Sequence, residues 1–218
     1  MVKGLLFDLD GVIVDTAKYH YLAWKQIADK LKIPFQETDN ERLKGVSRTK
    51  CFEILLEIGN LKMSQEQMAA YCERKNAVYL SYIKSMQADE ILPGVRDFID
   101  EAKETGYRIA LGSASKNSRL ILDKLDLTGL FDGIIDGTSV TKAKPDPEVF
   151  IKGARALNLT TEECIVFEDA AAGIEAAHNA GMAAVGVGDC KTLAAADCII
   201  HGFKDISVID ILERLGNY

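Results

Sequence analysis

Two aspartates one residue apart, Asp8 and Asp10, stand where an apolar run ends at Gly11. The run, residues 4–7, has the pattern of a strand buried on both faces, as in a parallel sheet. Because side chains alternate along an extended segment, both carboxylates should project to the same side. Two carboxylates so close repel each other unless a cation lies between them. The pair therefore predicts a divalent-metal site, a nucleophile beside an acid/base, or both. The alternative is that the aspartates only form a turn or cap a helix.

Further side chains able to do chemistry follow the later expected strands. In chain order they are Ser113, Lys144, Glu168 and Asp169. Carboxylate oxygens are ligands that Mg²⁺ takes beside water and a substrate phosphate. A serine hydroxyl can donate to a phosphoryl oxygen, and a lysine can neutralise its charge. One aspartate could be the covalent nucleophile while the second moves the proton. The set predicts phosphoryl transfer, although each residue alone could be a helix cap or a solvated loop residue.

The elements that must position these residues alternate between strands and helices from residue 92 onward. We expect strands at residues 107–112, 133–135, 164–167, 183–187 and 198–200. We expect helices at residues 117–125, 146–157 and 171–180. This alternation predicts an α/β fold with a doubly wound parallel sheet, and such sheets bind ligands beyond the carboxyl ends of their strands. The polar residues listed above follow those ends.

A long stretch after the first strand contains no strand candidate. Helices are expected at residues 17–31 and 47–58, the second ending at Gly59 and Asn60. A third begins after Ser64, with Gln67 at the capping-box position, and continues through Tyr82. We therefore expect an all-helical cap formed by residues 15–91, inserted into a catalytic core formed by residues 1–14 and 92–218.

Composition narrows the class of protein. The chain has 218 residues, 48% of them hydrophobic and 27% charged, which is ordinary for a globular protein. A net charge of -7 without a basic stripe argues against nucleic-acid binding. No apolar run approaches the roughly 18 residues that span a bilayer, and no signal sequence is evident. Five scattered cysteines without a CxxC pair are typical of reduced thiols. We expect a cytoplasmic monomer that acts on small molecules, with no nucleic-acid or membrane partner.

The motifs resemble those of a known superfamily. Asp8-Leu9-Asp10-Gly11-Val12, Ser113, Lys144-Pro145 and Glu168-Asp169 are similar to the four motifs of the haloacid dehalogenase superfamily of phosphotransferases. The resemblance covers the whole chain, including the inserted helical cap. Shorter stretches resemble the β-phosphoglucomutase family within it: Asp15-Thr16 with His20 and Trp24, residues 43–48, Arg74-Lys75-Asn76 and residues 113–117. Enzymes of that family use Mg²⁺ to interconvert β-D-glucose 1-phosphate and glucose 6-phosphate.

The resemblance implies a role for each matching residue. Asp8 would be the nucleophile and Asp10 the acid/base. Mg²⁺ would be held by the Asp8 carboxylate, the Asp10 carbonyl, Asp169 and, directly or through water, Glu168. The transferring phosphate would contact Ser113, Ala114 and Lys144. The distal phosphate of a β-D-glucose 1,6-bisphosphate priming intermediate would contact Arg48, Ser115, Lys116 and Asn117. The sugar would face Lys44, Gly45, Val46 and Ser47. Cap closure and substrate contact would involve Thr16, His20, Trp24 and Lys75.

Physical reasoning favours a mutase over its rivals. A mutase binds a sugar with phosphates at both ends and keeps water from the phosphoenzyme, so it needs a second anion pocket and a closing lid. A capped sugar-phosphate phosphatase of the same superfamily, the nearest alternative, needs one pocket only. A phospho-accepting signalling receiver is a more distant alternative, because it needs neither Asp10 nor a cap. Cys51 and Ala170 depart from the family pattern, since small hydroxyl residues are expected there. Ala170 should remove one hydrogen bond beside the metal carboxylates, and Cys51 should weaken one at the cap.

Overall fold

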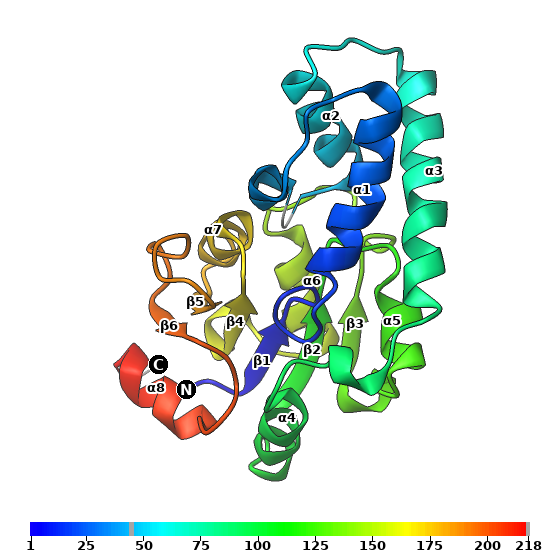
Figure 1. Ribbon diagram of the computed structural model, residues 1–218. Helices are drawn as coiled ribbons and strands as arrows, with labels where there is room; N and C mark the ends of the chain where they lie inside the picture. Colours follow the sequence, from blue (N-terminus) through cyan, green and yellow to red (C-terminus); the bar gives the residue numbers. More distant parts are fainter. Residues whose placement is uncertain (44–45, 217–218) are drawn as a thin grey trace.

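The computed structural model describes residues 1–43 and 46–216, and within them one parallel sheet forms the centre of the molecule (Figure 1). Its strands are β1 (Gly4–Phe7), β2 (Arg108–Gly112), β3 (Gly133–Ile135), β4 (Cys164–Glu168), β5 (Ala183–Val187) and β6 (Cys198–Ile200). Their order is β3-β2-β1-β4-β5-β6, and every neighbouring pair is parallel. The order reverses at β1, where ligands bind in doubly wound sheets. The α/β prediction is confirmed.

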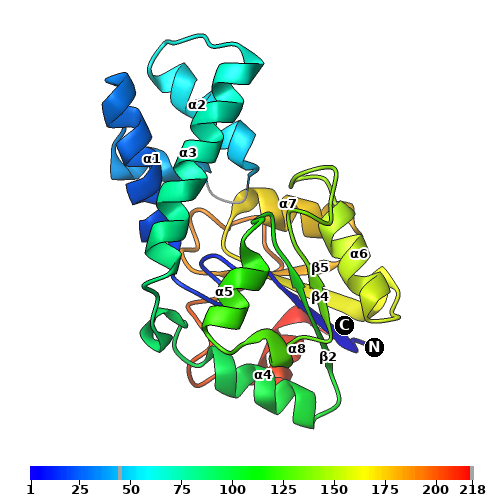
Figure 2. The same ribbon diagram turned by 90° about the vertical axis from the view of Figure 1, so that its right-hand side faces the viewer.

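Helices cover both faces of this sheet. They are α4 (Val95–Glu104), α5 (Ser118–Lys124), α6 (Glu148–Ala156), α7 (Ala171–Asn179) and α8 (Val208–Leu215). Figure 2 shows α6 and α7 on one side of the strands, with α4 and α8 on the other. Short 3₁₀ turns are η2 (Ala88–Glu90), η3 (Thr128–Leu130) and η4 (Thr161–Glu163). Helices α5, α6 and α7 each connect one strand to the next between β2 and β5, so this part of the chain consists of repeated strand–helix units.

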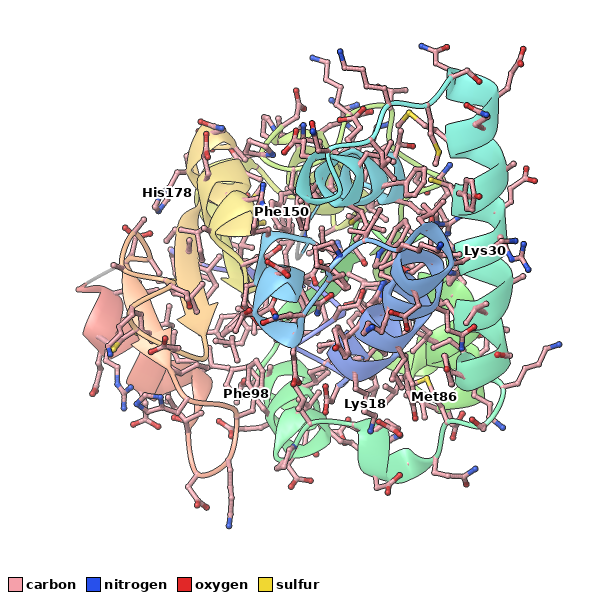
Figure 3. All side chains as sticks on the ribbon, turned by 45° about the horizontal axis from the view of Figure 1, so that its top comes forward. Lys18, Lys30, Met86, Phe98, Phe150 and His178 are labelled. Carbon is pink, nitrogen blue, oxygen red and sulfur yellow. The ribbon has the colours of Figure 1, made fainter. Side chains whose placement is uncertain are left out.

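The two faces carry two separate apolar clusters, as alternation along a strand requires. Phe7 belongs to the cluster with α4, α5 and α8, whereas Leu6 belongs to the cluster with α6 and α7. Phe98 and Phe150, both labelled in Figure 3, are buried members of these opposite clusters. The Phe7 ring stacks on that of Phe167, with centroids 4.6 Å apart. Strand β1 is thus fixed on both sides, which positions the residues that follow it.

A further group of helices, called the second helical layer because the helices on the sheet faces form the first, lies above the carboxyl ends of the strands (Figure 1). It comprises α1 (Ala17–Leu31), η1 (Glu37–Leu43), α2 (Arg48–Ile58) and α3 (Gln65–Ile83). This layer has its own apolar cluster, in which Trp24 stacks on Phe52 with ring centroids 5.9 Å apart. The predicted capping box at Ser64 and Gln67 begins α3. A separate cluster supports the division into core and cap, whose bounds at residues 15 and 91 remain our prediction.

Candidate active site

A tight turn after β1 fixes the first aspartate pair. The Asp8 N–H continues the sheet by donating to the Phe167 carbonyl at 3.0 Å, and Gly11 then turns the chain with φ of 82°. The Asp10 N–H donates to Asp8 Oδ2 at 3.1 Å. The turn-forming interpretation therefore describes part of the local structure. It does not explain the position of Asp8 Oδ1, which lies against the buried ammonium group of Lys144.

Lys144 joins two of the strand ends. Its ammonium lies 2.6 Å from Asp8 Oδ1 and pairs with Glu168 Oε1. All three side chains are buried, with Lys144 3% and Glu168 0% exposed. The ammonium also lies 4.7 Å from the centroid of the Phe150 ring. Although burial disfavours a charged lysine, the Asp8 and Glu168 carboxylates raise the pKa of Lys144 above its ordinary value. The lysine therefore remains charged.

Three carboxylates meet where a divalent cation could bind. Asp8, Glu168 and Asp169 each offer one oxygen, and these atoms lie within 4.8 Å of one another. Burial raises the pKa of the Glu168 carboxyl, even beside Lys144. Two glycines leave room for the carboxylates: a Cβ on Gly11 would lie 2.2 Å from Asp169 Oδ2, and one on Gly173 would lie 1.9 Å from Glu168 Oε1. Hard oxygen donors in this number fit Mg²⁺, and the family to which the motifs point generally uses that ion.

Asp10 lies beside the same carboxylates but contacts the second helical layer. Its Oδ1 accepts a hydrogen bond from the Thr16 hydroxyl, and its Oδ2 lies 3.7 Å from His20 Nε2. Burial, together with the negative charge of Asp8, raises the pKa of Asp10 to about 6. A carboxyl group with this pKa can both donate and accept a proton near neutral pH, which is what an acid/base requires.

Lys75 extends this chain of contacts into α3. Its Nζ lies 2.8 Å from His20 Nδ1, 4.6 Å from the Tyr79 ring centroid and 5.1 Å from that of Trp24. Burial lowers the pKa of Lys75 to about 7, and burial, with the nearby Lys75 charge, lowers that of His20 well below its ordinary value. His20 therefore stays neutral. The four residues assigned to cap closure (Thr16, His20, Trp24 and Lys75) thus form one group of contacts next to Asp10.

The loop after β2 contributes a polar group of residues to the site. The Ser115 N–H donates to Ser113 Oγ at 3.1 Å, and the Asn117 N–H donates to Ser115 Oγ at 3.2 Å. A Cβ on Gly137 would lie 2.2 Å from the Ala114 carbonyl oxygen, so the next loop packs directly on this one. Backbone and hydroxyl donors concentrated in a short loop are suited to phosphate binding.

A cavity of about 570 Å³ is lined both by the acidic residues after β1 and by the polar loop after β2. Most residues of the predicted site line it: Asp8, Asp10, His20, Trp24, Val46, Ser47, Arg48, Lys75, Ser113, Ala114, Ser115, Lys116, Asn117 and Asp169. Thr16, Lys144 and Glu168 are buried next to these residues. Lys44 and Gly45, predicted to face the sugar, lie outside the described residues.

Several residues in or beside the cavity had no predicted role in the site, among them Asn76, Asn40 and Cys72. Asn76 accepts hydrogen bonds from Arg48 Nη2 at 2.8 Å and from Asn117 Nδ2 at 2.9 Å. Asn40 and Cys72 line the cavity. Of the two departures noted from the family pattern, the Cys51 thiol donates to the Leu43 carbonyl at 3.3 Å, and the Ala170 N–H donates to Glu168 Oε2 at 3.1 Å. Asn76 belongs to the stretch Arg74-Lys75-Asn76 that resembles the β-phosphoglucomutase family, and this resemblance was a signal that could have drawn attention to it.

The raised pKa of Asp10 predicts a specific dependence of stability on pH. Since this pKa is about 6 in the folded protein against an ordinary 3.8, the folded state binds more protons between these values, and the free energy of unfolding should fall as pH rises through them. The Asp10→Asn variant has no carboxyl group at this position, so this decrease in the free energy of unfolding should be absent. In metal-free buffer, the free energy of unfolding of the variant relative to wild type should grow by about 2 kcal/mol between pH 4 and pH 7. Urea unfolding at several pH values measures it, and a constant difference would contradict the assignment.

Comparison with known proteins places this geometry in context. The model of a family described as haloacid dehalogenase-like hydrolase matches residues 2–181. A β-phosphoglucomutase of Bacillus subtilis is 39% identical over 219 residues, covering 100% of this chain and 97% of the relative. A phosphorylated carbohydrates phosphatase of Thermotoga maritima is 30% identical over 222 residues, 98% of this chain and 100% of the relative. The crystal structure of a β-phosphoglucomutase from Clostridium difficile superimposes with a TM-score of 0.94 at 39% identity, covering 99% of this chain and 97% of that one.

Within the described part of the chain, no helix combines the length and the apolar character needed to cross a membrane.

Proposed function

Because this chain belongs to the haloacid dehalogenase-like hydrolase family, we propose that it is a phosphotransferase that catalyses the β-phosphoglucomutase reaction, the interconversion of β-D-glucose 1-phosphate and β-D-glucose 6-phosphate. One observation carries the proposal. The same cavity is lined by Asp8 and Asp10 and also by Arg48, Lys116 and Asn117. A sugar carrying two phosphates needs an anion-binding group at each end, and this cavity offers both.

Asp8 is the proposed nucleophile. Lys144 contacts Oδ1 of Asp8 and the Asp10 N–H contacts Oδ2, so the carboxylate is held at the point where β1 ends. Its attack on phosphorus forms a bond to the carboxylate oxygen and breaks the bond to the sugar oxygen, giving an aspartyl phosphate. Mg²⁺, held by Asp8, Glu168 and Asp169, would supply positive charge to the phosphoryl oxygens when bound.

Asp10 is the proposed acid/base. It takes the proton from the 6-hydroxyl of β-D-glucose 1-phosphate as that oxygen accepts the phosphoryl group from Asp8, which yields β-D-glucose 1,6-bisphosphate. The bisphosphate then presents its other phosphate to Asp8. The same proton passes from Asp10 to the departing C1 oxygen, so the cycle conserves both the proton and the phosphoenzyme. A pKa of about 6 supports this double duty.

The helical layer would exclude water from the phosphoenzyme. Thr16 and His20, both from the α1 side of the chain, contact Asp10, and Lys75 contacts His20. These contacts would bring the acid/base into position only when the cap lies against the core, which favours a sugar over water as acceptor. The five free cysteines support a cytoplasmic location, and a monomer acting on small sugar phosphates completes the proposal.

Product identity tests the function directly. With Mg²⁺ and a trace of β-D-glucose 1,6-bisphosphate, we expect β-D-glucose 1-phosphate to yield glucose 6-phosphate in a dehydrogenase-coupled assay. The Thermotoga maritima relative makes a sugar-phosphate phosphatase the second candidate. Inorganic phosphate as the main product would decide in favour of that candidate.

Arg48 should determine affinity for the distal phosphate. Its guanidinium is half-buried beside the cavity and can form a bidentate contact with phosphate. Arg48→Ala should raise the KM for β-D-glucose 1,6-bisphosphate by about 10- to 100-fold, the loss expected for charge-assisted hydrogen bonds. Phosphorylation by acetyl phosphate, which has no distal phosphate, should change little.

The matched control is Arg42→Ala, which removes an exposed arginine of the same layer that pairs with Glu57 at 3.4 Å. It should leave both reactions unchanged. An unaltered bisphosphate KM in Arg48→Ala would remove Arg48 from the distal site.

A further inference from the structure

Asn76 lies where three elements of the chain meet. It belongs to α3, while Arg48 is the first residue of α2 and Asn117 precedes α5. A single oxygen, Asn76 Oδ1, accepts from Arg48 Nη2 at 2.8 Å and from Asn117 Nδ2 at 2.9 Å. Arg48 and Asn117 line the cavity, and all three side chains are half-buried. One neutral acceptor therefore connects the helical layer to the loop that follows β2.

This arrangement leaves the charge of Arg48 available to a ligand. Burial lowers the pKa of Arg48, and no carboxylate pairs with it among the described residues. A guanidinium has five N–H donors and a primary amide has two, so each side chain retains donors after bonding to Asn76. A carboxylate at position 76 would neutralise Arg48 and repel phosphate, whereas an amide oxygen orients both donors without consuming the charge.

We propose that Asn76 is a positioning residue for the distal phosphate: it holds Arg48 of the cap and Asn117 of the core at one point, so that both donate to the same phosphate group. This inference rests on the proposed function. Without Asn76, the two donors would sit on separate elements with no common partner, and each would lose orientation before the phosphate arrives. Preorganised donors bind more tightly because less side-chain freedom is lost on binding.

Equilibrium binding tests the inference apart from turnover. In an Asp8→Asn background, which cannot accept the phosphoryl group, calorimetry gives the Kd for β-D-glucose 1,6-bisphosphate with Mg²⁺. We expect Asn76→Ala to raise this Kd about 10-fold and the isosteric Asn76→Asp to raise it further, because the added charge pairs with Arg48 and repels phosphate. Gln26→Ala, which removes an amide of α1 bonded to the Tyr82 hydroxyl at 3.0 Å, is the control and should bind as the parent does.

Combination with Arg48→Ala separates positioning from a general structural role. If Asn76 acts through Arg48, adding Asn76→Ala to Arg48→Ala should cost much less affinity than it does alone. A parent-like Kd for Asn76→Ala, or fully additive losses in the double variant, would overturn the inference. Neither of these two results would affect the proposed mutase function, which is tested by the turnover of the wild-type chain. Failure of the parent to bind the bisphosphate would overturn the inference together with the distal site.

Discussion

Replacement of Asp8 by Asn should reduce mutase turnover by on the order of 10⁴-fold or more, because no other group could take the phosphoryl group in its place. An asparagine at position 8 keeps one side-chain oxygen, which could still accept a hydrogen bond from Lys144, and Lys144 also keeps its pairing with Glu168; the Asp10 N–H loses the acceptor it has in Asp8 Oδ2. The fold should therefore persist while the chemistry is lost. The coupled assay measures turnover, and intact mass after incubation with acetyl phosphate measures phosphorylation.

Asp29→Asn is the matched control, since Asp29 is an exposed carboxylate of α1 that pairs with Lys25. It should retain full turnover and full phosphorylation. Substantial phosphorylation of the Asp8→Asn chain would show that a different residue accepts the phosphoryl group.

Asp10→Asn should lower mutase turnover by about 10²- to 10⁴-fold, the usual contribution of general acid–base catalysis. The 6-hydroxyl must lose a proton and the departing C1 oxygen must gain one, and asparagine does neither. Acetate, in contrast, leaves acetyl phosphate without needing a proton. The variant should therefore still form phospho-Asp8 from acetyl phosphate.

This difference between donors identifies the role of Asp10. Near-normal mutase turnover in Asp10→Asn would contradict the acid/base assignment. Equal loss with both donors would indicate that the substitution disturbs Asp8 itself, which lies 3.1 Å from the Asp10 N–H.

The sequence was most informative at the strand ends. Apolar runs mark β1 and β4 because both strands are buried on both faces, and parallel strands must bring their carboxyl ends to one edge. That rule alone predicts that Asp8, Glu168 and Asp169 meet, as the structure shows. Lys144 follows the third expected strand and was included for that reason, but its contacts with Asp8 and Glu168 could not be predicted, because no local pattern determines the path of its loop.

Helices α4 and α8 and the contacts of Asn76 were not predicted, for different reasons. Helices α4 and α8 carried usable signals, with apolar residues at helical spacing in α4 and a capping box at Ser207 and Asp210 before α8. No local sequence pattern indicated the Asn76 contacts, because Arg48 lies 28 positions and Asn117 lies 41 positions from Asn76 in the chain. They depend on how the helical layer packs against the core, a relation that periodicity cannot express.

The most direct test of the central claim is to locate the phosphoryl group on the enzyme. The wild-type chain is mixed with β-D-glucose 1,6-bisphosphate and Mg²⁺, quenched in acid within the first turnovers, and mapped by peptide mass spectrometry. We expect one phosphorylated peptide, with the group on Asp8 and glucose monophosphate released in equal amount. Phosphorylation at another residue, or glucose monophosphate formed without any phosphoenzyme, would contradict the assignment.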